Sequence, residues 1–195
     1  KLCDMLTDKK KEYIAEFVLG KTTDTQDISG TVLSEAEVIC TEDDVREAVA
    51  SFIGEYEQLP PMYSAIKVDG KRLYELARQG KEVERKTRPV TFFEIEILDI
   101  CLPHVSVRVL CSKGTYIRTL CADIGKKLGT GAVMSSLVRT VCGNFGIEEA
   151  HRLSEIEAMS VEQRNALLKP IESLFEDCPS VTLSDFFGKL AACGC

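Results

Sequence analysis

The residues of this sequence best suited to chemistry lie in one short stretch, residues 112–119, which contains Lys113, Tyr116 and Arg118. A strand is predicted before it, because residues 104–110 alternate between polar and apolar side chains. A helix is predicted after it, because apolar side chains recur at helical spacing from residue 117 to residue 128, and Gly129 follows them. The stretch is therefore a strand-to-helix turn.

Such a turn presents free backbone N–H groups at the positive end of a helix, where anions bind. Arg118 and Tyr116 at the helix start, beside Lys113, suit an anionic ligand with a flat ring, such as a nucleotide. The alternative interpretation is structural, with a solvated Arg118 and a Tyr116 wedged at a domain edge. A motif of this size does not decide between the two on its own.

Charge is distributed unevenly along the chain. The 195 residues carry a net charge of −7, which argues against a protein that binds nucleic acid with its whole surface. Residues 67–88 hold eight basic and four acidic residues, and residues 108–139 hold six basic and one acidic. A fold that joins these two stretches would place one cationic face, suited to RNA or phosphate, on an acidic body. The alternative is that the charges cluster on solvated faces.

The nine cysteines are scattered, odd in number and without a C-x-x-C motif, which predicts reduced thiols in a cytoplasmic protein. Cys193 and Cys195 are close enough to share a metal, but no His or Cys partner lies near them, so no metal site is expected. No apolar run is long enough to span a bilayer, and no apolar export signal follows Lys1. No membrane partner is therefore expected.

Local patterns predict several elements around the turn. Alternation from Tyr13 to Leu19 predicts a strand, and residues 91–101 and 105–111 predict a hairpin around Pro103. Thr41, with Asp44 three residues on, predicts the cap of a helix that ends at Gly54. Further helices are predicted at 71–78, from Leu153 onward and from Ser160 to Leu168, and residues 22–30 are predicted as a polar loop. The tail at 185–192 is too short to be a domain. Residues 133–145 are predicted to hold a short apolar segment and then a strand.

Four groups of stretches together resemble one family, the bacterial tRNA pseudouridine-55 synthases of the TruB type. The resemblance covers the chain from Lys1 to about Leu183. It rests on residues 10–13 with 20–27, residues 58–67 with 70–80, residues 111–120, and residues 131–132 with 137–140. Four motifs in family order are far more specific than one of them alone.

The resemblance implies the isomerisation of one uridine, at position 55 in the T-arm of tRNA, to pseudouridine. It implies a target base that is flipped out into a pocket, and RNA that is read mainly by shape and backbone. The family uses no metal and no organic cofactor. The expected partner is the tRNA T-arm stem-loop, and the full-length protein is expected to be a monomer.

The resemblance also implies an α+β fold, with a mixed, mostly antiparallel sheet, flanking helices and an active-site cleft across one face of the sheet. Tyr13 matches the tyrosine that stacks on the flipped base, Arg118 the arginine that pairs with the catalytic aspartate, and Leu137 a leucine that packs near the base. Tyr116 and Lys113 are expected at the pocket edge. The candidates for contact with the RNA backbone are Lys67, Lys71, Arg72, Arg78, Lys113 and Arg139. Val138 stands where the family often has a second arginine, so one cation is lost there.

The family nucleophile is an aspartate in a Gly-His-x-Gly-x-Leu-Asp segment that precedes the Tyr13 strand, and the chain contains no such segment. The nucleophile is therefore expected to lie before Lys1. Without it, Arg118 is expected to have lost its partner and the 195 residues alone are expected to be inactive. Residues 1–180 are assigned to the catalytic domain without its N-terminal part, and residues 181–195 to the start of a truncated C-terminal region.

Two alternatives stay open. One is an RNA-guided relative of the same superfamily, although the motif from Pro60 to Ala65 and the small acidic body favour the stand-alone enzyme. The other is a non-catalytic protein that binds RNA or helps tRNA to fold.

Overall fold

The computed structural model describes residues 10–68, 70–175, 178–179 and 181–193, and the chain divides into two compact units at residue 150. The first unit contains β1 (Lys11–Leu19), β2 (Lys21–Thr23), β3 (Val32–Glu35), α2 (Glu42–Ala50), β4 (Gly54–Gln58), β5 (Lys67–Val68), β6 (Lys71–Arg72), α3 (Leu73–Arg78), β7 (Arg88–Cys101), β8 (His104–Cys111), α4 (Ile117–Lys127), β9 (Ala132–Cys142), β10 (Phe145–Gly146) and a 3-10 turn, η1 (Ile147–Glu149). The second contains α5 (Leu153–Ala158), α6 (Val161–Ala166), η2 (Ile171–Phe175) and α7 (Asp185–Ala192). No helix among the described residues is long and apolar enough to cross a membrane.

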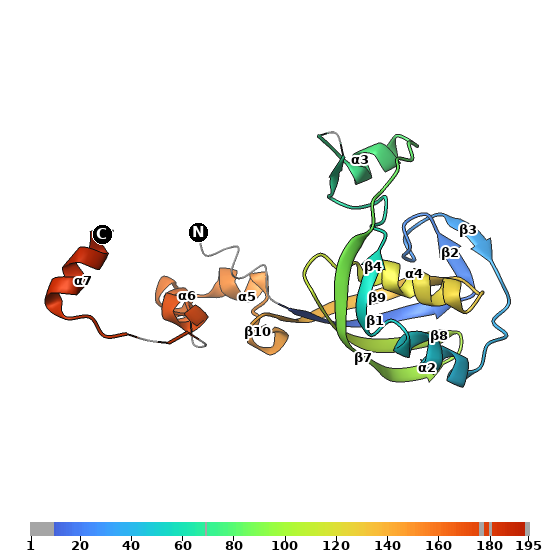
Figure 1. The fold of residues 1–195 in the computed structure, drawn as a ribbon. Helices are drawn as coiled ribbons and strands as arrows, with labels where there is room; N and C mark the ends of the chain where they lie inside the picture. Colours follow the sequence, from blue (N-terminus) through green and yellow to red (C-terminus); the bar gives the residue numbers. More distant parts are fainter. Residues whose placement is uncertain (1–9, 69, 176–177, 180, 194–195) are drawn as a thin grey trace. The chain divides into compact units, whose positions relative to one another are not determined.

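A six-stranded sheet forms the centre of the first unit, in the order β10-β9-β1-β8-β7-β4 (Figure 1). Its neighbouring strands pair antiparallel, which confirms the predicted α+β class. The alternation in β1 and β8 points Ala15, Phe17, Val107 and Val109 to the same buried face. Helices α2 and α4 contribute to the same core cluster, so they cover that face.

The opposite face of the sheet carries charge instead of a core. Arg108 on β8 lies 3.0 Å from Glu12 on β1, 2.8 Å from Glu94 and 2.6 Å from Glu96, both on β7. Glu94 and Glu96 are exposed to solvent, where an ion pair contributes little to stability, whereas Arg108 and Glu12 are partly buried. The helix-bearing face is therefore the face on which the unit builds its core.

Helix α4 is the element that connects the core to the predicted turn. It begins after Tyr116 and ends at the cap residue Leu128, and Gly129 follows with a φ of +74°, as the sequence predicts. Its apolar side passes into the core at Ile117, Leu120 and Ile124, all 3% exposed or less. The start of α4 is thereby fixed by its own packing.

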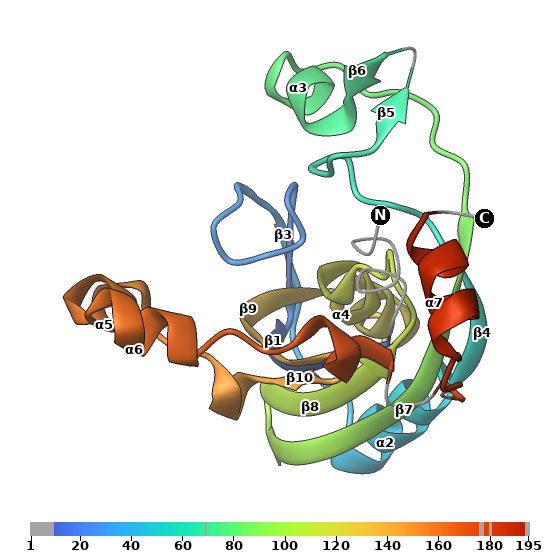
Figure 2. The same ribbon diagram turned by 90° about the vertical axis from the view of Figure 1, so that its left-hand side faces the viewer.

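Between β4 and β7 the chain leaves the sheet and forms a small projection of β5, β6 and α3 (Figures 1 and 2). The helix predicted for residues 71–78 begins two residues later, at Leu73, because Lys71 and Arg72 pair with β5. Leu73 and Leu76 are buried, so the projection has a small apolar centre of its own.

Four predicted boundaries differ from the structure. Helix α2 has the predicted capping box at Thr41 but ends at Ala50, since Phe52 turns to pack edge-on against Tyr56 and Gly54 starts β4. Residues 133–142 lie in the single strand β9, because they pair with β1 along nearly its whole length. The polar loop at 22–30 is flanked by β2 and β3, which pair as a hairpin, and α6 ends at Ala166, two residues short of Leu168.

The close packing of α4 gives a prediction about the sign of a stability change. Gly125 lies inside α4, and a Cβ atom there would collide with the backbone of Gly131 and Ala132. Alanine normally stabilises a helix relative to glycine by about 0.5–1 kcal/mol, but Gly125→Ala should lower the free energy of unfolding by about 1–3 kcal/mol, because the contact must open.

The matched control is Gly188→Ala in α7, where a Cβ meets no atom within 4 Å and the normal stabilising sign is expected. Urea denaturation of both variants tests the pair. Equal signs for the two substitutions would contradict the close approach at Gly125.

Candidate functional site

One pocket of about 250 Å³ gathers the residues of three elements that the sequence analysis singled out. Tyr13 comes from β1, Tyr116 and Arg118 from the turn and the start of α4, and Leu137 from β9. Thr115, Ile117 and Met134 complete the lining. The structure thus brings Tyr13, Tyr116, Arg118 and Leu137 together across 125 residues of sequence.

Strand register explains why the sheet residues of the pocket share a face. Leu137 lies opposite Ala15 and Met134 opposite Phe17, and directly opposite residues point to the same side of a sheet. Tyr13 precedes Ala15 by two residues, so it also points to the helix-bearing side. Leu137 is 41% exposed, so its side chain offers apolar surface to a ligand that enters from solvent.

Arg118 is held from two directions. Its Nη1 lies 3.4 Å from the Asp27 carboxylate, and its Nη2 donates to the backbone oxygen of Tyr63. Arg118 therefore has a carboxylate partner within this chain, Asp27, which is a different residue from the nucleophilic aspartate that the resemblance implies. Asp27 lies 91 positions away from Arg118 in the sequence, and its neighbouring residues contain no pattern that predicts this ion pair.

The Asp27 carboxylate is fixed by its own loop. The Ser29 N–H donates to it at 3.0 Å and the Thr25 hydroxyl at 2.9 Å, and the bond from the N–H two residues on is that of an Asx turn. Burial opposes ionisation of this carboxyl group, but the hydrogen bonds from Ser29 and Thr25 outweigh burial and hold its pKa below the usual value. Asp27 is therefore a charged partner for Arg118 at neutral pH.

The loop that carries Asp27 is docked on the pocket wall. Ile28 donates its N–H to the Met134 oxygen at 3.0 Å, and the Met134 N–H donates to the oxygen of Gln26 at 3.1 Å. The buried hydroxyl of Thr119 donates to the Gln26 side chain at 2.8 Å. Loop, helix α4 and strand β9 thus meet at one place, behind the residues that line the pocket.

Gln58, at the end of β4, positions the start of α4. Its side chain is 1% exposed. Its Oε1 accepts the N–H of Tyr116 at 2.8 Å, and its Nε2 donates to the oxygen of Tyr116 at 3.1 Å. The Gln58 amide thus bonds to both backbone groups of Tyr116, as a neighbouring strand would. Sequence reasoning placed Gln58 in a motif but missed its role, since a glutamine is rarely fully buried.

Tyr13 is half-buried at the edge of the core. Burial and the nearby Cys111 raise the pKa of the Tyr13 phenol, although hydrogen bonding to Arg139 acts in the opposite direction. Tyr13 and Arg139 are direct neighbours in the β1–β9 register. A neutral aromatic ring with one accessible face is suited to stacking on a base.

The other predicted RNA-contact residues lie outside this pocket. Lys67, Lys71, Arg72 and Arg78 are exposed on the projection of β5, β6 and α3. The guanidinium groups of Arg72 and Arg78 lie 5.8 and 5.4 Å from the ring centre of Tyr74. Lys113, which the resemblance placed at the edge of the base pocket, lines a different hollow.

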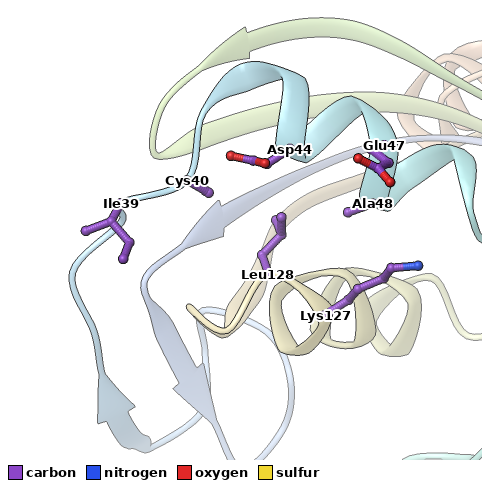
Figure 3. A pocket seen from close by; sticks show the side chains of 7 residues that line it. All are labelled: Ile39, Cys40, Asp44, Glu47, Ala48, Lys127 and Leu128. Atoms are coloured by element: carbon purple, nitrogen blue, oxygen red, sulfur yellow. The ribbon is translucent and has the colours of Figure 1, made fainter.

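A further hollow of about 410 Å³ lies where α2 and α4 face each other, lined by Ile39, Cys40, Asp44, Glu47, Ala48, Lys127 and Leu128 (Figure 3). Asp44 belongs to the cap of α2, accepting from Thr41. None of the predicted site residues lines this hollow.

We searched the described residues for metal-binding clusters and for paired cysteines. No group of three or more His, Cys, Asp or Glu side chains is arranged there to hold a metal ion. The cysteines in that part are free thiols, and Cys111 and Cys121 are buried, which raises the pKa of both. Cys195, one of the pair considered for a metal, lies outside the described residues.

Comparison with known proteins identifies relatives over nearly the whole chain. Residues 1–117 match the TruB family pseudouridylate synthase N-terminal domain, and residues 118–176 match the tRNA pseudouridylate synthase B C-terminal domain. The chain is 53% identical to tRNA pseudouridine synthase B of Alkaliphilus oremlandii over 88% of its own length and 57% of the relative's. It is 46% identical to tRNA pseudouridine synthase B of Aromatoleum aromaticum over 95% of its own length and 60% of the relative's.

Solved structures agree with these relatives. The chain superposes over its full length on 51% of a chain in a Cbf5-Nop10-Gar1 complex, with a TM-score of 0.70 and 27% identity. It also matches a chain in an H/ACA RNP bound to a substrate RNA containing 2′-deoxyuridine, with a TM-score of 0.60 and 25% identity, over 90% of this chain and 44% of that one. This chain spans about three fifths of the length of the curated relatives.

The clamp at Gln58 predicts a cost for its removal. Gln58→Ala leaves the N–H of Tyr116 without its partner, whereas the Tyr116 oxygen still accepts from Leu120, so the free energy of unfolding should fall by about 1–3 kcal/mol. Gln79→Ala, at an exposed glutamine, should change it by less than about 0.5 kcal/mol. Hydrogen exchange of the Tyr116 amide should accelerate in the first variant alone. Unchanged exchange there would contradict the clamp.

The Asp27 carboxylate predicts a pH dependence with a definite sign. Because its pKa is lowered in the folded protein, its ionised form stabilises the fold above the ordinary aspartate pKa of about 4, and this stability is lost as the pH falls through the folded value. Asp27→Asn should therefore destabilise the protein at neutral pH, and the difference from the unsubstituted protein should shrink on acidification.

Urea denaturation across that pH range measures this difference, with Asp99→Asn on the exposed edge of β7 as the control. A deficit of Asp27→Asn that stays constant with pH would show that the carboxylate charge is not what stabilises this loop.

Proposed function

The chain belongs to the TruB family of pseudouridylate synthases, and we propose that its full-length protein converts the uridine at position 55 in the T-arm of tRNA to pseudouridine. The observation that carries the proposal is the single pocket lined by Tyr13, Tyr116, Arg118 and Leu137. Its matched relatives are named for the modification of tRNA.

The pocket suits a uracil flipped out of the T-loop. Tyr13 stacks on the ring, and Leu137 packs against the base from β9. The bond between sugar C1′ and base N1 breaks, the uracil turns in its plane, and a bond from C1′ to C5 forms. C5 loses a proton and N1 gains one, so the reaction is an isomerisation that needs no oxidant, metal or organic cofactor. Stacking permits the turn because it holds the ring without fixing its in-plane orientation.

The nucleophile in this proposal is an aspartate outside the 195 residues, paired with Arg118. A guanidinium has five N–H donors, and Asp27 and the Tyr63 oxygen engage one nitrogen each. The remaining donors can bind a second carboxylate in two-point geometry, which keeps it ionised and aimed at the sugar. Arg118 is thus oriented by this chain before the nucleophile meets it.

The RNA backbone contacts the basic side chains around the pocket. Arg139 lies beside Tyr13, and the projection offers exposed cations above the sheet. In the proposal the phosphates of the T-arm are bound by Lys67, Lys71, Arg72, Arg78, Lys113 and Arg139. The full-length protein acts as a monomer in the cytoplasm, where it finds tRNA, with residues 1–180 in its catalytic domain and residues 181–195 at the start of its C-terminal region.

An RNA-guided mode is the second candidate, because a chain of a Cbf5-Nop10-Gar1 complex shares the fold over the full length of this chain. The higher identity to stand-alone tRNA pseudouridine synthase B relatives favours the first mode. Activity of the full-length protein on a bare T-arm stem-loop, without any guide RNA, separates the two.

Arg118 provides the test of the proposed chemistry. Arg118→Lys in the full-length protein keeps a charge but loses the two-point geometry, so pseudouridine formation in a T-arm stem-loop should fall by about 10²–10³-fold. Arg46→Lys, on the exposed side of α2, is the matched control and should leave the rate unchanged.

Two outcomes would contradict the proposal in different ways. If the unsubstituted full-length protein forms no pseudouridine, the enzyme function is wrong and the binding-only alternative gains support. If the purified 195-residue chain forms pseudouridine by itself, the nucleophile lies within it.

A further inference from the structure

We propose that Lys11, Arg88 and Lys113 form a second binding site, which takes a phosphodiester group of the RNA strand that enters the base pocket. They line a hollow of about 540 Å³ together with Pro89, Val90 and Gly114. This inference rests on the proposed function, since it assigns part of the same substrate to a site that the base does not occupy.

Antiparallel pairing brings the three cations together from distant parts of the sequence. Lys11 begins β1 and lies opposite Cys111, the last residue of β8. Arg88 begins β7, which pairs with β8 along its length. Lys113 follows β8 by two residues. The starts of β1 and β7 and the end of β8 therefore meet at one end of the sheet.

The turn that carries Lys113 is fixed to β7. The Ser112 N–H donates to the Thr91 oxygen at 2.9 Å, and the Thr91 N–H donates to the Ser112 hydroxyl at 2.9 Å. This reciprocal pair holds Lys113 beside the strand that begins with Arg88. The spacing of the cations is thus set by backbone hydrogen bonds.

The charge of the hollow favours an anion. Its lining contains three cationic side chains, one at the start of β1, one at the start of β7 and one in the turn after β8. Arg88 ends one basic stretch of the sequence and Lys113 lies in the other, so the fold joins the two stretches on a chain with a net charge of −7. Positive groups concentrated on an acidic body attract a polyanion to that place.

Position favours the RNA backbone over a free anion. Gly114 lines the cationic hollow, and the next two residues, Thr115 and Tyr116, line the base pocket. The two sites are therefore built on consecutive residues of one turn. A nucleotide flipped into the pocket keeps its covalent neighbours at the pocket mouth, where the cations of this hollow can bind a phosphate. Gly114 has a φ of +79°, and the space where its Cβ would stand is empty, so a ligand can approach the backbone.

The salt dependence of binding tests this site in the full-length protein. Arg88→Ala and Lys113→Ala should each weaken binding to a T-arm stem-loop several-fold, and each should reduce the slope of log affinity against log salt concentration by about 1. Arg46→Ala removes an equal charge from exposed α2 and should leave the slope unchanged.

A neutral backbone analogue locates the phosphate. Stem-loops that carry one methylphosphonate, at each position flanking the target uridine in turn, should identify one position whose neutralisation weakens binding to the unsubstituted protein but not to Arg88→Ala. Inorganic phosphate should displace RNA only at concentrations that match its general ionic-strength effect. Specific displacement at lower concentrations would show a free-anion site and overturn the proposal.

The outcomes separate this site from the proposed function. If the unsubstituted protein forms pseudouridine but both variants keep the salt slope of Arg46→Ala, the site is wrong and the function stands. If the slopes fall as expected but no pseudouridine forms, the site binds RNA and the enzyme function is wrong. Arg88→Gln, a second neutral substitution of an exposed side chain, replaces Arg88→Ala if the latter does not fold.

Discussion

Two hydrogen bonds between the Gln58 side chain and the Tyr116 backbone fix the place where α4 begins, and the candidate pocket depends on that place. A helix start has unsatisfied backbone groups and tends to fray, and here Tyr116 makes no side-chain cap of its own. The buried Gln58 amide instead holds the backbone of the cap residue itself in place. With the start of α4 fixed and its apolar side in the core, Arg118 leaves the helix toward β1 and β9 in one direction only.

An RNA-modifying site must bind both a base and the RNA backbone. At this end of the sheet, different residues are available for each. Along one part of the turn at residues 112–116, an aromatic ring and an aliphatic side chain form an apolar surface for a flat base. Along another part, three cations from separate strands form a polar surface for the backbone. Because both surfaces are built on one turn locked to β7, they keep a constant separation, which is what a nucleotide of fixed covalent length requires.

Much of the fold could be predicted from local sequence patterns, because β1, the β7–β8 hairpin and α4 each bury one regular face. The capping box at Thr41 could also be predicted from the sequence, because its partner Asp44 lies only three residues away. The end of α2 was not, because Phe52 leaves the helix to contact Tyr56 on the next strand. Local periodicity thus identified the elements, and tertiary packing decided where some of them end.

The features of the pocket also fall into those that the sequence predicted and those that it did not. Motif resemblance brought together Tyr13, Arg118 and Leu137, whereas the pairing of Arg118 with Asp27 and the clamp at Gln58 join residues 91 and 58 positions apart. Such contacts depend on how loops dock on strands, which no local pattern encodes. For the cationic hollow, the sequence showed only that there are two basic stretches. It could not show that Arg88 and Lys113 lie close together, because that depends on the strand register of the whole sheet.

Asp27 changes what Arg118 can contribute to the site. A solvated arginine would lose side-chain entropy when it met a carboxylate, and that cost would weaken the pair. Here Asp27 and the Tyr63 oxygen have already immobilised the guanidinium, and Asp27 is in turn fixed by Thr25 and Ser29. A second carboxylate then meets donors whose orientation is set before it arrives. Preorganised charge of this kind is where electrostatic stabilisation in enzymes is largest. Under the proposed function, the loop at residues 24–30 therefore helps to position Arg118, although none of its side chains lines the pocket.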